Sequence, residues 1–247
     1  MNPPVPNAKD HYDRFLAKQY AWMAGDFLVN VEKNRAFFAG QGIRPSGMGQ
    51  AVDLGAGCGF VTIPLLEAGF FVTAVDFCKP LLDELRLYAT SPHLLTVAGD
   101  IMDFPLWAGR DPELIVCMGD TLTHLPDTET VVRLIRQCHA ELVPGGRFVL
   151  SLRDYSQEDA GSVVVIPVRR DADRIFLCRL AYQADHVGVT DVLYSRESGA
   201  WERSCGEYRK LRIAPVFLER ELERAGFRIA VNTIREGLIT MIARKDA

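Results

Sequence analysis

The sequence lacks several features that mark particular classes of protein. Its 28 lysines and arginines are balanced by 32 aspartates and glutamates, so the net charge of −4 offers no overall basic footprint for a nucleic acid. No apolar run approaches the roughly 20 residues that cross a bilayer. The first ten residues, MNPPVPNAKD, contain three prolines and no apolar core of a secretory leader. We therefore expect a cytoplasmic protein whose partners include neither nucleic acid nor membrane.

Closely spaced cysteines are also missing. The six cysteines lie far apart in the chain, at Cys58, Cys78, Cys117, Cys138, Cys178 and Cys205. None belongs to a Cys-x-x-Cys pair, which argues against a zinc site or a redox pair, and we expect no metal. With 48% hydrophobic and 24% charged residues the composition is that of an ordinary folded protein. The 247 residues suffice for one large domain or for a core with an elaboration.

The first 42 residues predict a tail followed by two helices. Residues 1–8 are expected to form a disordered tail. Residues 9–24 carry apolar side chains at three- and four-residue steps, which predicts a helix, and a second helix is expected over about 26–40. The glycines and proline of GIRPSGMGQ end it. We therefore treat 9–42 as a helical segment and 43–247 as the main domain.

From residue 51 onward, short apolar strands alternate with helices. The strand-like runs are AVDL, FFVTAV, LLTVAGD, ELIVCMGD and RFVLSL. Helical patterns such as KPLLDELRLYA and TETVVRLIRQCHAELV separate them. This order is typical of right-handed βαβ units, so we expect an α/β fold with a Rossmann-like, doubly wound and mostly parallel sheet.

The alternation stops after residue 153. Residues of about 161–213 contain the strand-like runs SVVVIPVRR, RIFLCRLAYQ and HVGVTDVLYS and a further run around EYRKLRI, with turns and no helix between them. We predict an antiparallel β insertion here. A helix over APVFLERELERAG and a hairpin of FRIAVNTI and LITMIARK then close the chain.

The strongest motif is the glycine turn DLGAGCG between the first strand and the next helix. Gly55, Gly57 and Gly59 would let the backbone approach a ligand closely, because glycine has no Cβ to clash. Gly55, Ala56 and Gly57 are the expected ligand contacts of this turn. A dinucleotide fingerprint needs a small residue at position 60, where this chain has Phe60. The turn therefore does not predict a pyrophosphate site, and a tight turn without any ligand stays an alternative.

Three further groups of residues follow predicted parallel strands, where open α/β sheets bind ligands. Asp76, with Phe77 beside it, could accept hydrogen bonds from both ribose hydroxyls of a nucleoside. Asp100 and Ile101 suit an adenine, because the carboxylate can accept from its amino group while the apolar side chain packs on the ring. Met118 and Gly119 follow the fourth strand. Each acidic residue alone could be a solvated strand end, but their conjunction favours a nucleoside site.

With these motifs the chain resembles the class I S-adenosylmethionine (SAM)-dependent methyltransferases. The resemblance covers about residues 50–153 and rests on the glycine turn and on the acidic residues after the second and third strands. It implies a seven-stranded sheet with one reversed strand, and SAM as the cofactor. It also implies that the N-terminal helical segment folds over the cofactor as a lid, with Tyr12 and Tyr20 as contacts. Packing into a core is the alternative for these aromatic residues.

Two longer segments resemble the glycine N-methyltransferase type of small-molecule enzyme. They are CMGDTLTHLPD (117–127) and PGGRFVLSLRDY (144–155). The resemblance implies that Arg153 holds a substrate carboxylate and that His124 lies near the cofactor. Asp120 stands where that family has asparagine, which leaves the substrate open. His124, Asp120 and Tyr155 are the candidates for taking a proton from an ammonium substrate.

These resemblances predict a methyltransferase (EC 2.1.1.-) that transfers the methyl group of SAM to a small amine or carboxylate-bearing metabolite by in-line displacement. The antiparallel insertion is expected to cover the site or to form a homodimer surface. Two alternatives stay open, an RNA or protein methyltransferase and a non-catalytic SAM-binding module. A surface ion pair is the alternative for Arg153 and a structural role the alternative for His124. The basic cluster Arg209–Arg212 suits a solvated strand face, with attraction of an anionic substrate as a lesser option.

Overall fold

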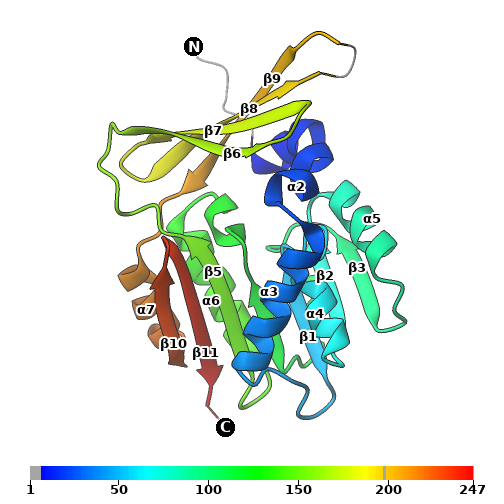
Figure 1. Cartoon of the computed structure of the whole chain (residues 1–247). Helices are drawn as coiled ribbons and strands as arrows, with labels where there is room; N and C mark the ends of the chain where they lie inside the picture. The colour runs from blue at the N-terminus through cyan, green and yellow to red at the C-terminus, as the bar shows by residue number, and fades with distance from the viewer. Residues whose placement is uncertain (1–6, 197–198, 247) are drawn as a thin grey trace.

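The N-terminal region is helical from residue 8 onward. The computed structural model describes residues 7–196 and 199–246, so residues 1–6 of the predicted tail lie outside the described part (Figure 1). The tail is nevertheless shorter than predicted, because the Asn7 side chain caps the first helix by accepting from the Asp10 backbone N–H. Four helical segments follow, α1 Ala8–His11, the π-helical turn η1 Tyr12–Leu16, α2 Ala17–Ala24 and α3 Phe27–Gly40.

The main domain is built on a seven-stranded sheet in the order β10-β11-β5-β4-β1-β2-β3. Its parallel strands are β1 Gln50–Leu54, β2 Phe71–Asp76, β3 Leu94–Ala98, β4 Leu114–Cys117 and β5 Arg147–Arg153. The closing hairpin is β10 Phe227–Arg235 and β11 Leu238–Lys245. Strand β11 runs antiparallel to both β5 and β10. The predicted fold class and its single reversed strand are therefore confirmed.

Helices cover both faces of this sheet. They are α4 Thr62–Glu67, α5 Lys79–Tyr88, α6 Thr128–Glu141 and α7 Pro215–Arg224, with short 3₁₀ turns η2 Phe104–Leu106 and η3 Thr121–His124. One apolar cluster joins α6 and α7 to the sheet, and another joins α3 and α4 to it. Double coverage explains why β4 is apolar and buried at every position. Among the described residues, no helix is both long and apolar enough to cross a membrane.

The insertion forms a separate four-stranded antiparallel sheet, as predicted. Its strands are β6 Val163–Arg170, β7 Arg174–Tyr182, β8 His186–Ser195 and β9 Glu202–Leu211. Figure 1 shows this sheet above the carboxyl ends of the parallel strands, with α2 beneath it. Leu16 from the N-terminal helices packs against Phe176 and Leu193 of the insertion. The helical lid and the insertion sheet thus form one cover over the main domain.

The order of the parallel strands fixes where this cover meets the sheet. The chain runs outward from β1 through β2 to β3, and it then returns to β4 on the other side of β1. Such a switch leaves a crevice at the carboxyl ends of the two neighbouring strands, because their following loops turn in opposite directions. The glycine turn follows β1 and Met118 follows β4, so both lie at this crevice.

Candidate active site

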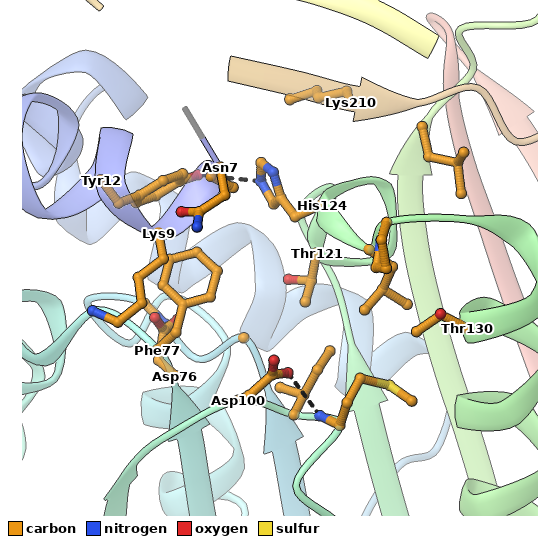
Figure 2. Close-up of a pocket in the computed structure, with 18 of the residues that line it drawn as sticks. Asn7, Lys9, Tyr12, Asp76, Phe77, Asp100, Thr121, His124, Thr130 and Lys210 are labelled. Carbon is orange, nitrogen blue, oxygen red and sulfur yellow. Dashed lines mark hydrogen bonds between the residues drawn. The ribbon is translucent and has the colours of Figure 1, made fainter. Parts of the chain in front are cut away.

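A cavity of about 1150 Å³ lies between the cover and the carboxyl ends of the parallel strands. Figure 2 shows Tyr12 and His124 facing each other in it, with Asp76 and Asp100 on the side of the strand ends and Lys210 on the side of the insertion. The cavity brings together most of the residues predicted from the sequence. These are Tyr12, Tyr20, Gly55, Gly57, Asp76, Phe77, Asp100, Ile101, Met118, Gly119 and His124.

The glycines in the loops after β1 and β4 differ in what the absent Cβ leaves room for. A Cβ on Gly57 would reach into open cavity, with the Tyr20 ring as its nearest neighbour at 3.8 Å, and one on Gly119 would meet nothing within 4 Å. Both have positive φ angles, 53° and 72°. A Cβ on Gly55 would instead lie 2.2 Å from Thr121 Oγ1. Gly57 and Gly119 therefore leave room for a ligand against the backbone, whereas Gly55 leaves room for the Thr121 side chain.

Ala56 does not line the cavity, which corrects its predicted role as a cofactor contact. The side chain is buried in an apolar cluster with Ala74, Leu82 and Leu85. It packs the turn against the sheet and α5, so its contribution to a ligand site is indirect. Sequence spacing alone could not separate it from the two glycines that flank it.

Asp76 is held in place by the backbone on both sides. Its Oδ2 accepts from the Gly57 N–H at 2.8 Å and its Oδ1 from the Cys78 N–H at 2.7 Å. The residue is only 7% exposed, and this burial raises the pKa of the carboxyl group to about 6. Each carboxylate oxygen has two acceptor positions, so each can take a second donor from the cavity. This geometry suits the two hydroxyl groups of a ribose.

Asp100 and Ile101 form the next part of the wall. Asp100 Oδ1 accepts from the Met102 N–H at 2.8 Å, which fixes the carboxylate at the end of β3. Ile101 is buried and presents an apolar surface to the same cavity. An acceptor beside an apolar wall suits the amino edge and the face of an adenine ring. Together with Asp76 and Gly57, these residues fit the adenosine part of SAM.

His124 and Tyr12 form a polar pair next to this region. The Tyr12 hydroxyl lies 3.4 Å from His124 Nε2, and the two rings are nearly perpendicular, with centroids 5.5 Å apart. His124 Nδ1 is buried and has no hydrogen-bond partner among the described residues. Burial, helped by the positive charge of Lys210, lowers the pKa of His124 to about 3. The imidazole is therefore neutral at physiological pH and can exchange a hydrogen bond with a ligand.

Asp120 and Tyr155 do not line the cavity, although both were predicted to act on the acceptor. Asp120 Oδ2 lies 2.6 Å from Lys210 Nζ and accepts from the Tyr155 hydroxyl at 3.1 Å. Burial alone would raise the pKa of Asp120, but the charge of Lys210, its hydrogen bond and the hydrogen bond from the Arg153 backbone N–H hold this pKa well below its usual range. A carboxylate held in this way is a poor proton acceptor. Both residues instead anchor Lys210, which reaches over from β9.

Arg153 is also absent from the cavity wall, so its contact with a substrate carboxylate stays a prediction of the sequence resemblance. Its side chain is exposed at the end of β5, and its backbone N–H donates to Asp120 Oδ1 at 2.5 Å. Among the described residues, the lysines and arginines that line the cavity are Lys9, Lys79, Arg133, Arg209 and Lys210.

Lys210 is the main site residue that the sequence prediction missed. The sequence favoured a solvated face for the basic cluster Arg209–Arg212, with attraction of an anionic substrate as the lesser option, but alternation along β9 places Lys210 on the face of the buried Tyr208. That signal was present in the sequence. Arg212 is structural, because it donates to the backbone carbonyls of Tyr155 and Gln183 at 2.9 and 2.6 Å.

Comparison with known proteins supports this picture. Residues 51–146 match the family described as a methyltransferase domain. Glycine N-methyltransferase from Rattus norvegicus is 28% identical over 160 residues, 59% of this chain and 54% of that protein. Cypemycin N-terminal methyltransferase from Streptomyces sp. is 31% identical over 133 residues, 52% of this chain and 53% of that protein. The chain thus spans only about half the length of these relatives.

The whole fold has a match among solved structures. The CcbJ methyltransferase from Streptomyces caelestis superposes with a TM-score of 0.78 at 22% identity, covering 96% of this chain and 98% of that one. These comparisons support the resemblance stated from the sequence, because residues 51–146 match a methyltransferase domain and the whole chain has the fold of a solved methyltransferase.

Proposed function

We propose that this chain, which has the fold of the class I SAM-dependent methyltransferases, transfers a methyl group from SAM to a small-molecule amine. One observation carries the proposal. A single cavity of about 1150 Å³ joins a nucleoside-shaped region to a neutral histidine–tyrosine pair. That volume is at the upper end for one small ligand, so it leaves room for cofactor and acceptor together.

In this proposal the backbone and two carboxylates hold the cofactor. Asp76 accepts from the ribose hydroxyls, Asp100 and Ile101 hold the adenine, and Gly57 and Gly119 leave space for the rest of the molecule. Tyr20 closes the cavity over Gly57. When bound, SAM supplies an electrophilic methyl group on its sulfonium. The residues present fit this group, because glycine leaves open space where a Cβ would stand and both Asp76 oxygens retain acceptor capacity.

His124 and Tyr12 would orient the acceptor. An imidazole with a pKa of about 3 is too weak a base to remove a proton from an ammonium ion, so the amine must react after losing its proton to water. The histidine can still accept a hydrogen bond from the amine and direct its lone pair. Alignment of two bound reactants can supply about 7–11 kcal/mol of the barrier lowering, so positioning can be the main contribution of the enzyme.

The acceptor would also carry an acidic group. Lys210, Arg209 and Arg133 all line the cavity, and Lys210 reaches it from the insertion. A guanidinium group can bind a carboxylate through two parallel hydrogen bonds, which gives orientation as well as charge. We therefore assign recognition of an acid group to Arg209 and Arg133, in place of the Arg153 predicted from the sequence. We also propose, from the sequence alone, that the protein is cytoplasmic and forms a homodimer.

A peptide with a free N-terminal amine is the second candidate acceptor. It is favoured by the similarity to the cypemycin N-terminal methyltransferase and by the cavity-lining residues Arg209 and Arg133, which are exposed to solvent. A peptide would place its terminal amine by His124 and leave the rest of its chain outside. Small metabolites and peptides share the same reacting group, so the two candidates differ only in what extends from the cavity.

Incubation with methyl-labelled SAM tests the proposal. The acceptors compared are amino acids and amino sugar acids, uncharged amines, a peptide with a free N-terminus, and tRNA. We expect label on the acidic small amines. Label on the peptide alone would favour the second candidate, and label on tRNA would favour an RNA methyltransferase. Binding of SAM without transfer to any acceptor, including a metabolite extract, would instead indicate a non-catalytic module.

A further inference from the structure

The imidazole ring of His11, at the end of α1, occupies a notch in the insertion sheet. His11 Nε2 lies 2.9 Å from Asp191 Oδ2, and the two side chains are 1% and 4% exposed. Gly206 is the cross-strand partner of Asp191 in the pairing of β8 with β9. A Cβ on Gly206 would lie 2.5 Å from His11 Nδ1, closer than side chains tolerate. The ring therefore fills space that only glycine leaves free at this position.

Tyr208 connects this notch to the cavity. It lies two residues beyond Gly206, so both face the same side of β9. The rings of His11 and Tyr208 stack with centroids 4.5 Å apart and an interplanar angle of 20°. The Tyr208 ring centroid is also 5.7 Å from that of His124. The insertion sheet thus holds the lid histidine and the cavity histidine through one aromatic side chain.

The next residue after His11 is the one whose hydroxyl reaches His124. Tyr12 begins the π-helical turn η1, and a single π-helical turn changes the direction of the side chains that follow it. Tyr20 is held differently. Its ring stacks with Phe60, with centroids 6.2 Å apart, in a cluster that includes Cys58 of the main domain. Tyr12 and Tyr20 also pack on each other, with ring centroids 5.9 Å apart, and both contact apolar residues of the main domain and of the insertion. What distinguishes them is His11, which anchors the start of η1 to the insertion sheet, and the Phe60 ring, which holds Tyr20 on the main domain.

We propose that His11 and Asp191, seated over Gly206, are positioning residues that fix the Tyr12 hydroxyl against His124. This role rests on the proposed methyl transfer, in which Tyr12 and His124 orient the acceptor. Loss of the His11 contact loosens the start of η1, where Tyr12 lies, while the Phe60 contact still holds Tyr20 on the main domain. Alignment of the acceptor then suffers more than binding of the cofactor.

Substitution of Gly206 by alanine is the sharpest test, because it removes no polar group. Its matched control is Gly188→Ala in the neighbouring strand β8, where the new Cβ would meet nothing closer than 3.7 Å. We expect Gly206→Ala to lower kcat about tenfold or more while the KM for SAM stays within about twofold. The control should match the wild type. His11→Gln keeps an N–H for Asp191 and should retain more kcat than His11→Leu.

A double-mutant cycle shows whether Gly206→Ala lowers kcat through the Tyr12 hydroxyl. Tyr12→Phe should lower kcat to a similar extent, and Gly206→Ala should add little in the Tyr12→Phe background, because both act through one hydroxyl group. Fully additive losses would overturn the proposal. Equal losses in kcat and in SAM affinity would also overturn it, since they would indicate a general opening of the lid.

Hydrogen–deuterium exchange separates this inference from the proposed function. Amides of residues 8–16 should exchange faster in Gly206→Ala than in Gly188→Ala, and those around Tyr20 should not change. This readout needs no acceptor, so it decides the anchor even if the wild-type protein transfers no methyl group. Unchanged exchange in 8–16 would overturn the anchor, and absent wild-type turnover with changed exchange would overturn the proposed function alone.

Discussion

The two sides of the cavity are constructed by different means. On the cofactor side, backbone N–H groups of Gly57, Cys78 and Met102 hold two carboxylates at strand ends. On the acceptor side, side chains from three distant segments meet, with Tyr12 from the lid, His124 after β4 and Lys210 from the insertion. The first side depends on local turns in the main domain. The second depends on how a separate sheet and a helical segment dock over it.

This difference indicates where acceptor choice resides. Residues on the cofactor side are tied to the backbone of neighbouring turns, so their substitution alters the turn as well as the ligand contact. The acceptor side is assembled from side chains on the cover, and each can change without altering the parallel sheet. We therefore expect substitutions in the two regions to separate cofactor affinity from acceptor use and from docking of the cover.

The largest expected effect is on docking of the cover. Lys210→Met leaves Asp120 buried without its cation, and breaking a buried ion pair in this way costs about 3–5 kcal/mol of unfolding free energy. Chemical denaturation of the purified variant measures the loss. The double variant Lys210→Met/Asp120→Asn should recover most of it. If the two single losses simply add, the pair is not the link between insertion and main domain that we describe.

The second-largest expected effect is on the affinity for SAM, and it tests the contact proposed for Asp76. Asp76→Asn replaces two acceptor oxygens by one oxygen and one amide, which would face a backbone N–H. Lost charge-assisted hydrogen bonds should weaken SAM binding about 100-fold. Isothermal titration measures this change, with Asp103→Asn as the control, because Asp103 is exposed and lies outside the cavity. Equal affinities for the two variants would remove Asp76 from the cofactor site.

The effect of pH on SAM binding should be smaller than the effect of Asp76→Asn, and acidification should weaken binding. Burial raises the pKa of Asp76 to about 6, and only the ionised carboxylate can accept from both ribose hydroxyls. The affinity should therefore be constant at higher pH and should fall as the pH drops below about 6, by up to about tenfold per pH unit. The Asp76→Asn variant should lose this dependence. Affinity that increases on acidification would contradict the assigned contact.

Arg153→Ala should have the smallest effect. The side chain is exposed and lies outside the cavity, and alanine keeps the backbone N–H that Asp120 accepts. We expect the KM for the acceptor and the affinity for SAM to stay within about twofold of wild type. Steady-state kinetics with an acid-bearing amine gives the answer. A selective tenfold rise in acceptor KM would restore the role that the sequence resemblance implied for Arg153.

The same division explains what could be predicted from the sequence. The sequence predicted that Asp76, Asp100 and Gly57 lie together, because a strand end followed by a turn places its next residues at one sheet edge, and all three line the cavity. Helix and strand periods also located the insertion within a few residues of its observed bounds, β6 to β9 over 163–211. Strand ends, turns and strand lengths are set by residues close together in the sequence, so the sequence pattern can predict them.

The acceptor side could not be predicted in this way. Arg153 ends strand β5 and Lys210 lies within β9, and no local pattern indicates that β9 crosses over Asp120 while the Arg153 side chain is exposed. The contact of His11 with Asp191 joins residues 180 positions apart, and it depends on a notch at Gly206. Such contacts follow from docking of the insertion on the main domain. The tertiary arrangement therefore had to be known before these roles could be assigned.

The central claim is that the cavity between sheet and cover holds SAM. Isothermal titration of the wild-type protein with SAM and with S-adenosylhomocysteine tests it most directly, because it requires no knowledge of the acceptor. We predict that each binds at one site per chain and that Asp76→Asn weakens both. Absence of binding by either compound to the folded wild-type protein would contradict the account.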